Sequence, residues 1–200
     1  MQQSLNLGPN DIVMERPFTH PSHTFSDMYV LRYIIDQLCL TVQQYSAPPT
    51  VIHQTEPDGR PLRLVILQPD FLNHLQDLAV VGFFGHKQAG VSFDRLDHMD
   101  EQLIDELPHH TGLLSYCTLR LHGDSSANLV LFAHSDAKAT WGTSDIHSQA
   151  VHLAPYHYAS VRIYNGQLSE GVHNSGTLRV TTARYFDYQS NPFWRATRQV

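Results

Sequence analysis

The chain has 200 residues, 42% of them hydrophobic, and a formal net charge of −6. This size and composition fit one globular domain, and the lack of a Lys/Arg cluster argues against a nucleic-acid partner, which needs a basic surface. No apolar run approaches the roughly 18 to 20 residues that cross a bilayer, and residues 1–18 lack the basic and apolar regions of a signal peptide. We therefore expect a cytoplasmic protein without a membrane span.

The first part of the chain predicts an arm and then a helix. Residues 1–26 contain three prolines and little periodicity, so we expect an extended N-terminal arm. Apolar residues then recur every three or four positions over 28–45, which predicts an amphipathic helix with Ser26 or Asp27 as its N-cap.

A β-hairpin is predicted directly after this helix. The apolar runs 50–55 and 60–68 flank a Pro-Asp-Gly turn. Proline presets φ at such a turn and glycine accepts positive φ. We therefore expect residues 27–70 to form a helix-and-hairpin extension.

Strand-like and helix-like patterns alternate over residues 71–190. Apolar or alternating strand patterns are found at 78–88, 113–121, 128–134, 159–166 and 176–188, and helical patterns at 93–107 and from about 141 to 158. The acidic side chains of the first of these two helices are interpreted as a solvated face. Residues 191–200 are predicted to be a C-terminal tail whose Phe193 and Trp194 pack back onto the body.

The order of these elements from residue 78 onward is β-α-β-β-α-β, followed by a further strand. This order is typical of the split βαβ, or ferredoxin-like, α+β fold, in which helices cover one face of an antiparallel sheet. The other face must be covered too, and a partner subunit is a common solution. We therefore expect a homodimer.

Residues 78–167 resemble the dimeric α+β barrel superfamily, which includes the antibiotic-biosynthesis-type monooxygenases. The resemblance lies in the segment ANLVLFAHSDAKATWGTSDIH followed by VRIYNGQL. It implies a dimeric α+β barrel with a ligand pocket between the sheet and its two helices. The superfamily also includes haem-binding and haem-processing proteins, and it hosts many unrelated chemistries.

Trp141, Ser144 and His147 are the candidate site residues near the start of the second helix. Their spacing of three places each pair on roughly one side of a helix. A neutral imidazole beside an indole wall could accept the proton of a phenolic or enolic oxygen near pH 7. The alternative is that Trp141 belongs to the core and that His147 bonds a backbone carbonyl or Asp145.

Three further residues are candidates for the lining of the pocket. Phe83 lies in the strand pattern that precedes the first helix, where we expect it behind Trp141. His86 and His134 end two strands, and strand ends on one rim of a sheet often border pockets. Such polar residues also occur simply where a strand meets water.

The fourteen histidines of the chain raise the question of a metal or a haem. His147, His152 and His157 are five residues apart, so on an ideal helix they point to different sides, and we predict no metal site. A single axial histidine is enough for haem, which stays an alternative to having no cofactor. Cys39 and Cys117 are interpreted as small buried hydrophobic residues in a reducing compartment.

Three functional hypotheses follow. The first is a monooxygenase-like enzyme, with no cofactor, that binds a small apolar or aromatic molecule, with His147 as proton acceptor and Trp141 as pocket wall. The second is a non-enzymatic ligand-binding or interaction module of the same fold. The third is a haem-binding or haem-processing protein.

Overall fold

The computed structural model describes residues 4–45, 48–173 and 176–200. Its strands are β1 Leu5–Leu7, β2 Thr50–Thr55, β3 Pro61–Ile66, β4 Leu78–Lys87, β5 Leu113–Arg120, β6 Ser125–Phe132, β7 Tyr158–Leu168, β8 Leu178–Asp187 and β9 Trp194–Gln199. Its helices are α1 Ser22–Val42, α2 Pro69–His74, α3 Phe93–Glu106, α4 Ser135–Trp141 and α5 Asp145–His157, with short 3-10 turns at Pro17–Thr19 and Leu107–His109. No described helix combines the length and the apolar character needed to cross a membrane.

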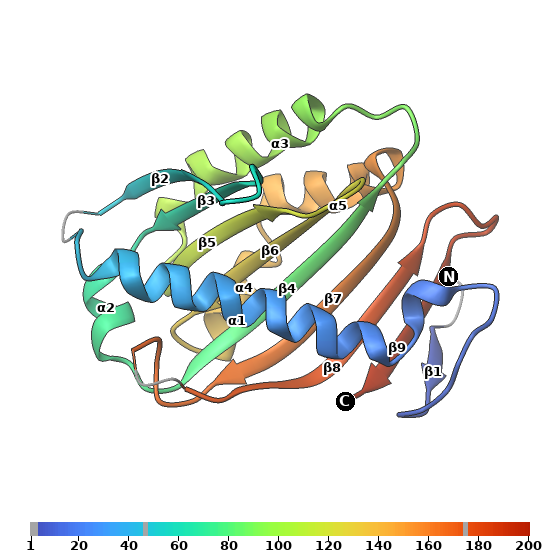
Figure 1. Cartoon of the computed structure of the whole chain (residues 1–200), viewed down its shortest axis with the longest axis horizontal. Coiled ribbons are helices and arrows are strands. Elements are labelled where there is room, and N and C mark those ends of the chain that lie inside the picture. Colours follow the sequence, from blue (N-terminus) through green and yellow to red (C-terminus); the bar gives the residue numbers. More distant parts are fainter. Residues whose placement is uncertain (1–3, 46–47, 174–175) are drawn as a thin grey trace.

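In the described part of the chain the strands form one sheet in the order β1-β9-β8-β7-β4-β6-β5-β3-β2. Neighbouring strands are antiparallel except β1 and β9, which pair in parallel. Helix α1 crosses one face of the sheet diagonally, and α3, α4 and α5 lie on the opposite face (Figure 1). The chain is thus an α+β protein with a mostly antiparallel sheet.

Helix α1 supplies the core of its face of the sheet. The predicted helical spacing places Leu31, Ile34, Ile35 and Leu38 on one side, and all four are fully buried. Each such side chain contributes about 1.5 to 3 kcal/mol on burial. The helix packs closely because β4 has a glycine beneath it: a Cβ on Gly82 would lie only 2.6 Å from a methyl group of Leu31.

The position of α1 removes the reason given above for expecting a partner subunit. We expected a second copy to cover the sheet face that the βαββαβ helices leave open. In the structure α1 of the same chain covers that face, so its apolar residues do not require a second copy. A homodimer stays a prediction.

Helix α1 also begins earlier than its sequence pattern indicates. It starts at Ser22, with Pro21 in the N-cap position, instead of at residue 28. The predicted cap, Asp27, is therefore inside the helix and is buried. Its carboxylate accepts hydrogen bonds from Arg162 Nε at 2.6 Å, Arg162 Nη2 at 2.9 Å and Tyr164 Oη at 2.8 Å. The residue that was predicted to cap the helix anchors it to β7.

Both ends of the chain differ from the prediction of an arm and a tail. Strand β9 lies within the predicted tail, and β1, within the predicted arm, pairs with it in parallel. Arg198 of β9 is buried and donates hydrogen bonds to the carbonyl oxygens of Gly8, Asp11 and Thr19. These bonds hold the N-terminal segment against the sheet. Trp194 packs edge-on against Phe18, at a centroid distance of 6.4 Å.

Candidate functional site

The structure places Trp141 at the end of α4, in the core. Its side chain is 7% exposed and packs against Phe132, with ring centroids 5.7 Å apart. The single helix expected from about 141 to 158 is preceded by α4 and begins only at Asp145, so Trp141 and Ser144 lie outside it. The residue proposed as a pocket wall therefore packs as a core residue.

Ser144 and His147 lie next to Trp141 at the corner between the two helices. Ser144 is the N-cap of α5: its Oγ accepts a hydrogen bond from the backbone N–H of His147 at 3.1 Å and donates one to Glu106 Oε2 at 3.2 Å. The His147 ring lies 4.3 Å from the Trp141 ring, centroid to centroid, and burial lowers the pKa of His147. The three residues thus meet through a helix corner instead of along one helix face. A ligand-facing role for them stays a prediction.

The other three predicted residues do not share one pocket rim. Phe83 faces the α5 side of the sheet and contacts Tyr158, with centroids 5.2 Å apart. His86 is exposed at the end of β4 and lies 3.1 Å from Ser125 Oγ. His134 caps α4 by accepting a hydrogen bond from Ala137 N at 3.2 Å. Because β4 and β6 are antiparallel, the two histidines lie at opposite ends of the sheet.

A polar centre that the sequence interpretation missed lies between α3 and the sheet. Asp100 of α3 pairs with Arg63 of β3, and each side chain is only 13% exposed. The Asp100 carboxylate also accepts hydrogen bonds from Tyr116 Oη at 2.7 Å and Thr118 Oγ1 at 3.2 Å. Asn128 of β6 donates a hydrogen bond to Tyr116 Oη. We call Arg63, Asp100, Tyr116, Thr118 and Asn128 the Asp100 centre.

The electrostatics of the Asp100 centre differ from those of a solvated acidic face. Burial raises the pKa of Asp100, and the Arg63 guanidinium only partly opposes this effect. Burial and the neighbouring carboxylate hold the pKa of Tyr116 well above its usual range. The prediction that the acidic side chains of this helix are solvated is therefore wrong for Asp100. A readable signal existed, because Tyr116, Thr118 and Arg120 alternate with apolar residues along β5.

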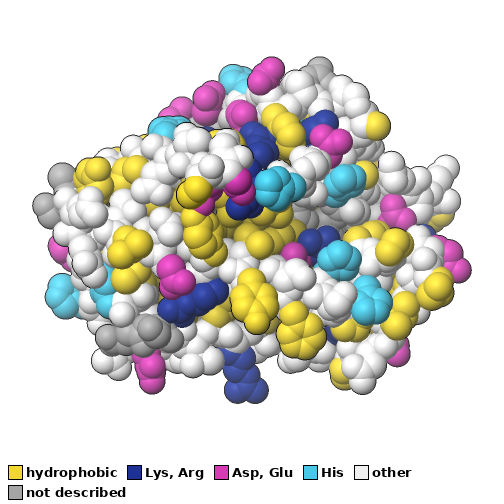
Figure 2. All heavy atoms as spheres, viewed as in Figure 1, with side chains coloured by type: hydrophobic (Ala, Val, Ile, Leu, Met, Phe, Trp, Pro, Cys, Tyr) yellow, Lys and Arg dark blue, Asp and Glu magenta, His cyan; other side chains and the backbone are white. Residues whose placement is uncertain are grey.

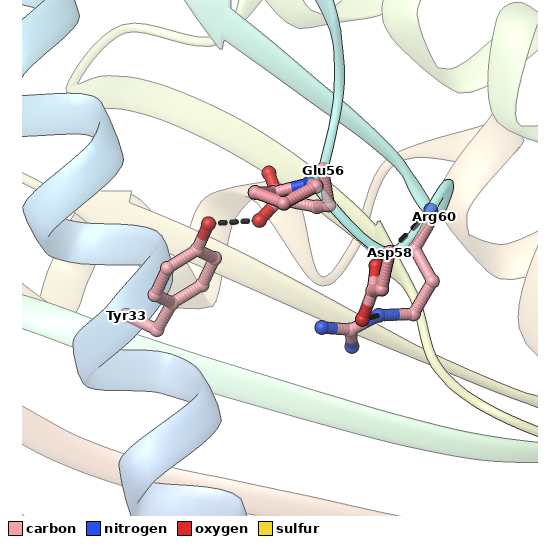
Figure 3. A pocket seen from close by; sticks show the side chains of 5 residues that line it. Tyr33, Glu56, Asp58 and Arg60 are labelled. Atoms are coloured by element: carbon pink, nitrogen blue, oxygen red, sulfur yellow. Dashed lines mark hydrogen bonds and ion pairs between the residues drawn. The ribbon is translucent and has the colours of Figure 1, made fainter.

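A surface pocket opens on the opposite face, between α1 and the β2–β3 turn. It has a volume of about 320 Å³ and is lined by Tyr33, Glu56, Pro57, Asp58 and Arg60. Figure 3 shows Tyr33 extending from α1 toward Glu56, with Asp58 and Arg60 on the far side of the turn. Figure 2 shows this face hollowed beside α1, with acidic, basic and histidine side chains gathered near the hollow. We call this the turn pocket.

The charges of the turn pocket do not balance. Arg60 Nε pairs with Asp58 Oδ2 at 2.7 Å, and the Arg60 hydrogen bonds outweigh desolvation and lower the pKa of Asp58. Glu56 is only 7% exposed and accepts a hydrogen bond from Tyr33 Oη, which raises the pKa of Tyr33 to about 12. Among the described residues, no cation lies within ion-pair distance of Glu56. One buried carboxylate of the pocket is thus bonded to a neutral group.

A second surface pocket, of about 500 Å³, lies along α5. It is lined by Asp145, Ser148, Gln149, His152 and Leu153. His152 is one of the three histidines that lie five residues apart in the sequence. No three His, Cys, Asp or Glu side chains of residues 4–45, 48–173 and 176–200 lie close enough to hold a metal ion. Haem binding stays a prediction.

Comparison with known proteins does not assign the chain to a family. No family model and no curated protein matches it. The similar solved structures include protein SO0527 from Shewanella oneidensis, at 14% identity over 49% of this chain and 96% of that one, with a TM-score of 0.43. They also include NE2512, a protein of unknown function from Nitrosomonas europaea, at 14% identity over 48% of this chain and 91% of that one, with a TM-score of 0.42. At these TM-scores the likeness carries no argument about fold or function.

Proposed function

We propose that the protein is a non-enzymatic binding module for a small aromatic amine, which occupies the turn pocket. The observation that carries the proposal is the buried Glu56 carboxylate without an ion-pair partner among the described residues. A buried charge is costly unless an opposite charge compensates for it. A ligand ammonium group would provide that charge.

The remaining lining residues suit the rest of such a ligand. Tyr33 and Pro57 offer apolar surface, and an aromatic ring beside a cation adds a favourable cation–π interaction. With two carboxylates and one guanidinium, the lining carries a net negative charge that favours a cation over an anion. The volume of about 320 Å³ is at the small end of the range for ligand sites.

Calorimetric titration with tyramine tests this proposal, with 4-hydroxyphenylacetate as its anionic counterpart. We expect tyramine to bind and the acid to bind at least about tenfold more weakly, a difference of roughly 1.4 kcal/mol. Glu56→Gln should weaken tyramine binding by a similar factor, whereas Glu101→Gln on the exposed side of α3 should leave it unchanged. Equal affinity for both compounds, or full binding by Glu56→Gln, would contradict the proposal.

A second proposal is monooxygenase-like proton abstraction from a phenol or enol at the Asp100 centre. It is favoured by the raised pKa of Asp100, whose side chain is enclosed between α3 and the sheet. A carboxylate with a raised pKa is a stronger base, and such groups cluster at catalytic sites. Oxygen uptake with a panel of quinols tests it and distinguishes Asp100 from His147, the acceptor predicted from the sequence. Loss of uptake in Asp100→Asn with uptake retained in His147→Ala would assign the base to Asp100, whereas no uptake by the native protein would reject the proposal.

A third proposal concerns architecture: β4 to β7 with α3 and α4–α5 form a ferredoxin-like core. The strand order β7-β4-β6-β5 and the placement of these helices on one face support it. Helix α1 already occupies the sheet face through which two such cores would form a dimeric barrel. A homodimer would therefore use another surface, and sedimentation equilibrium would detect it.

A further inference from the structure

Three polar side chains from distant parts of the sequence meet beside the C-terminal half of α1. Cys39 lies on α1, Asn73 on α2, and His173 in the connection between β7 and β8. Cys39 Sγ lies 3.3 Å from His173 Nδ1, and His173 Nε2 lies 2.6 Å from Asn73 Oδ1. Cysteine, histidine and asparagine in this order of contacts are the components of a thiol nucleophile with its base and orienting residue.

The hydrogen bonds fix which nitrogen of His173 carries the proton. Asn73 Oδ1 can only accept, so His173 Nε2 must donate to it. Gln43 Nε2, 3.3 Å from His173 Nδ1, can only donate. His173 Nδ1 therefore carries the lone pair, which can accept from Gln43 Nε2 or from the Cys39 thiol, each 3.3 Å away. In this tautomer the imidazole can accept the thiol proton.

Residues on either side of His173 in the sequence contact α1 and the segment that follows α2. Gly171 N donates to Gln76 O at 2.7 Å, and Val172 is buried in the core beneath α1. Arg32 Nη1 donates to Gly176 O at 2.6 Å, from the same side of α1 as Cys39. His173 is thus positioned by contacts on both sides of it in the sequence.

Cys39 also differs from the other cysteine of the chain. Cys117 is fully buried, and burial raises its pKa to about 12. Cys39 is partly exposed, which corrects the expectation that both are buried hydrophobic residues. Burial and the Asp36 carboxylate raise the pKa of Cys39, so its thiol is protonated at neutral pH and needs a base in order to react.

We propose that Cys39, His173 and Asn73 form a nucleophilic thiol site that takes acyl groups from small esters. Cys39 Sγ attacks the ester carbonyl carbon and forms an S–C bond, while its proton moves to His173 Nδ1. The C–O bond breaks, and the alcohol leaves with that proton. Water then hydrolyses the thioester, which releases the carboxylic acid and restores the thiol. This site is separate from the turn pocket, so it does not depend on the binding function proposed above.

Acylation by p-nitrophenyl acetate tests the proposal on the full chain. We expect a burst of one equivalent of p-nitrophenolate and an acetyl group that peptide mass mapping places on Cys39. General-base assistance is worth on the order of 10²-fold or more, so His173→Gln should slow acylation by about that factor at pH 7. Cys117→Ser should react like the native protein, and Cys39→Ser should lose the burst.

Two further measurements separate a base from a merely structural role. The rates of native protein and His173→Gln should converge at alkaline pH, where the thiol ionises without help. Asn73→Ala should slow acylation at pH 7, and Asn73→Asp, which retains an acceptor for His173 Nε2, should restore it. Equal rates for native protein and His173→Gln at pH 7, or acetylation at residues other than Cys39, would overturn the proposal.

Discussion

Beneath α1 the sheet presents aliphatic side chains and one buried ion pair, whereas beneath α3 it presents the Asp100 centre. Leu31, Ile34, Ile35 and Leu38 fill the first interface. In the first two turns of α3, by contrast, Asp97 and Asp100 contact arginines of β5 and β3. Burial removes water from apolar side chains without breaking hydrogen bonds, whereas each buried polar group needs its own hydrogen-bond or ion-pair partner. We therefore expect the interface beneath α1 to contribute more to stability than the interface beneath α3.

The largest expected effect comes from removing the buried Asp27–Arg162 ion pair beneath α1. Asp27→Ala leaves Arg162 buried without its carboxylate, and we expect a loss of about 3 to 5 kcal/mol in unfolding free energy. Asp36→Ala, which removes an exposed pair with Arg32 on the same helix, should cost less than about 1 kcal/mol. Urea unfolding measures both, and equal losses would refute the anchoring role of Asp27.

The aliphatic part of the same face should respond nearly as strongly. Ile34→Ala creates a cavity beneath α1 and should cost about 2 to 5 kcal/mol. Tyr29→Ala is the matched control, because this side chain is 80% exposed on the outer side of α1 and its loss should change stability by less than about 0.5 kcal/mol. A small effect of Ile34→Ala would mean that α1 is not the main cover of this face.

Removal of the N-cap of α5, on the opposite face of the sheet, should lower stability by a smaller amount. Ser144→Ala removes the hydrogen bond to the His147 N–H, and we expect a loss of about 1 kcal/mol. Ser148→Ala, at an exposed position inside α5, should leave stability unchanged or slightly higher, because alanine has the better helix propensity. Thermal unfolding resolves the difference, and a loss at Ser148 as large as at Ser144 would contradict the capping role.

The pH dependence of stability sharpens the comparison further. The pKa of Asp100 is raised in the folded state, so the folded chain holds a proton that the unfolded chain releases above its ordinary value of 3.8. The stabilisation that this proton provides is thus present at low pH, and it is lost as pH rises from 3.8 to the raised pKa of the folded state. Relative to Asp100→Asn, the native protein should therefore lose stability as pH rises. Urea unfolding of both proteins from pH 4 to 8 measures this difference. A native protein that gains stability over Asp100→Asn as pH rises would contradict the prediction.

Local patterns were sufficient for most of the elements. The helical spacing of α1 and the Pro-Asp-Gly turn between β2 and β3 are properties of short segments, and the structure contains both. Strand β9 was missed because Arg198, a charged residue, points inward from it. Its guanidinium is satisfied by three carbonyl oxygens that are nearly 180 residues or more away in sequence, and no local pattern reports such bonds.

The candidate sites were harder to predict because they depend on tertiary contacts. Tyr33 and Glu56 come from a helix and a turn, and only the packing of α1 across the sheet brings them together. The Cys39, His173 and Asn73 side chains likewise come from α1, the β7–β8 connection and α2, and only the tertiary fold brings them together. The Asp100 centre could have been predicted from the sequence, since β5 alternates polar and apolar residues and α3 carries Asp97 and Asp100 three residues apart.

The parallel pairing of β1 with β9 has a consequence for protein synthesis. Leu5–Leu7 is synthesised before its partner in the sheet, which lies about 190 residues later in the sequence. At roughly 5 to 20 residues per second, the wait between them is roughly 10 to 40 s. During that time the Arg198 guanidinium is also absent, so it cannot bind the carbonyl groups of Gly8, Asp11 and Thr19. Leu5–Leu7 can therefore reach its place in the sheet only after β9 has been synthesised.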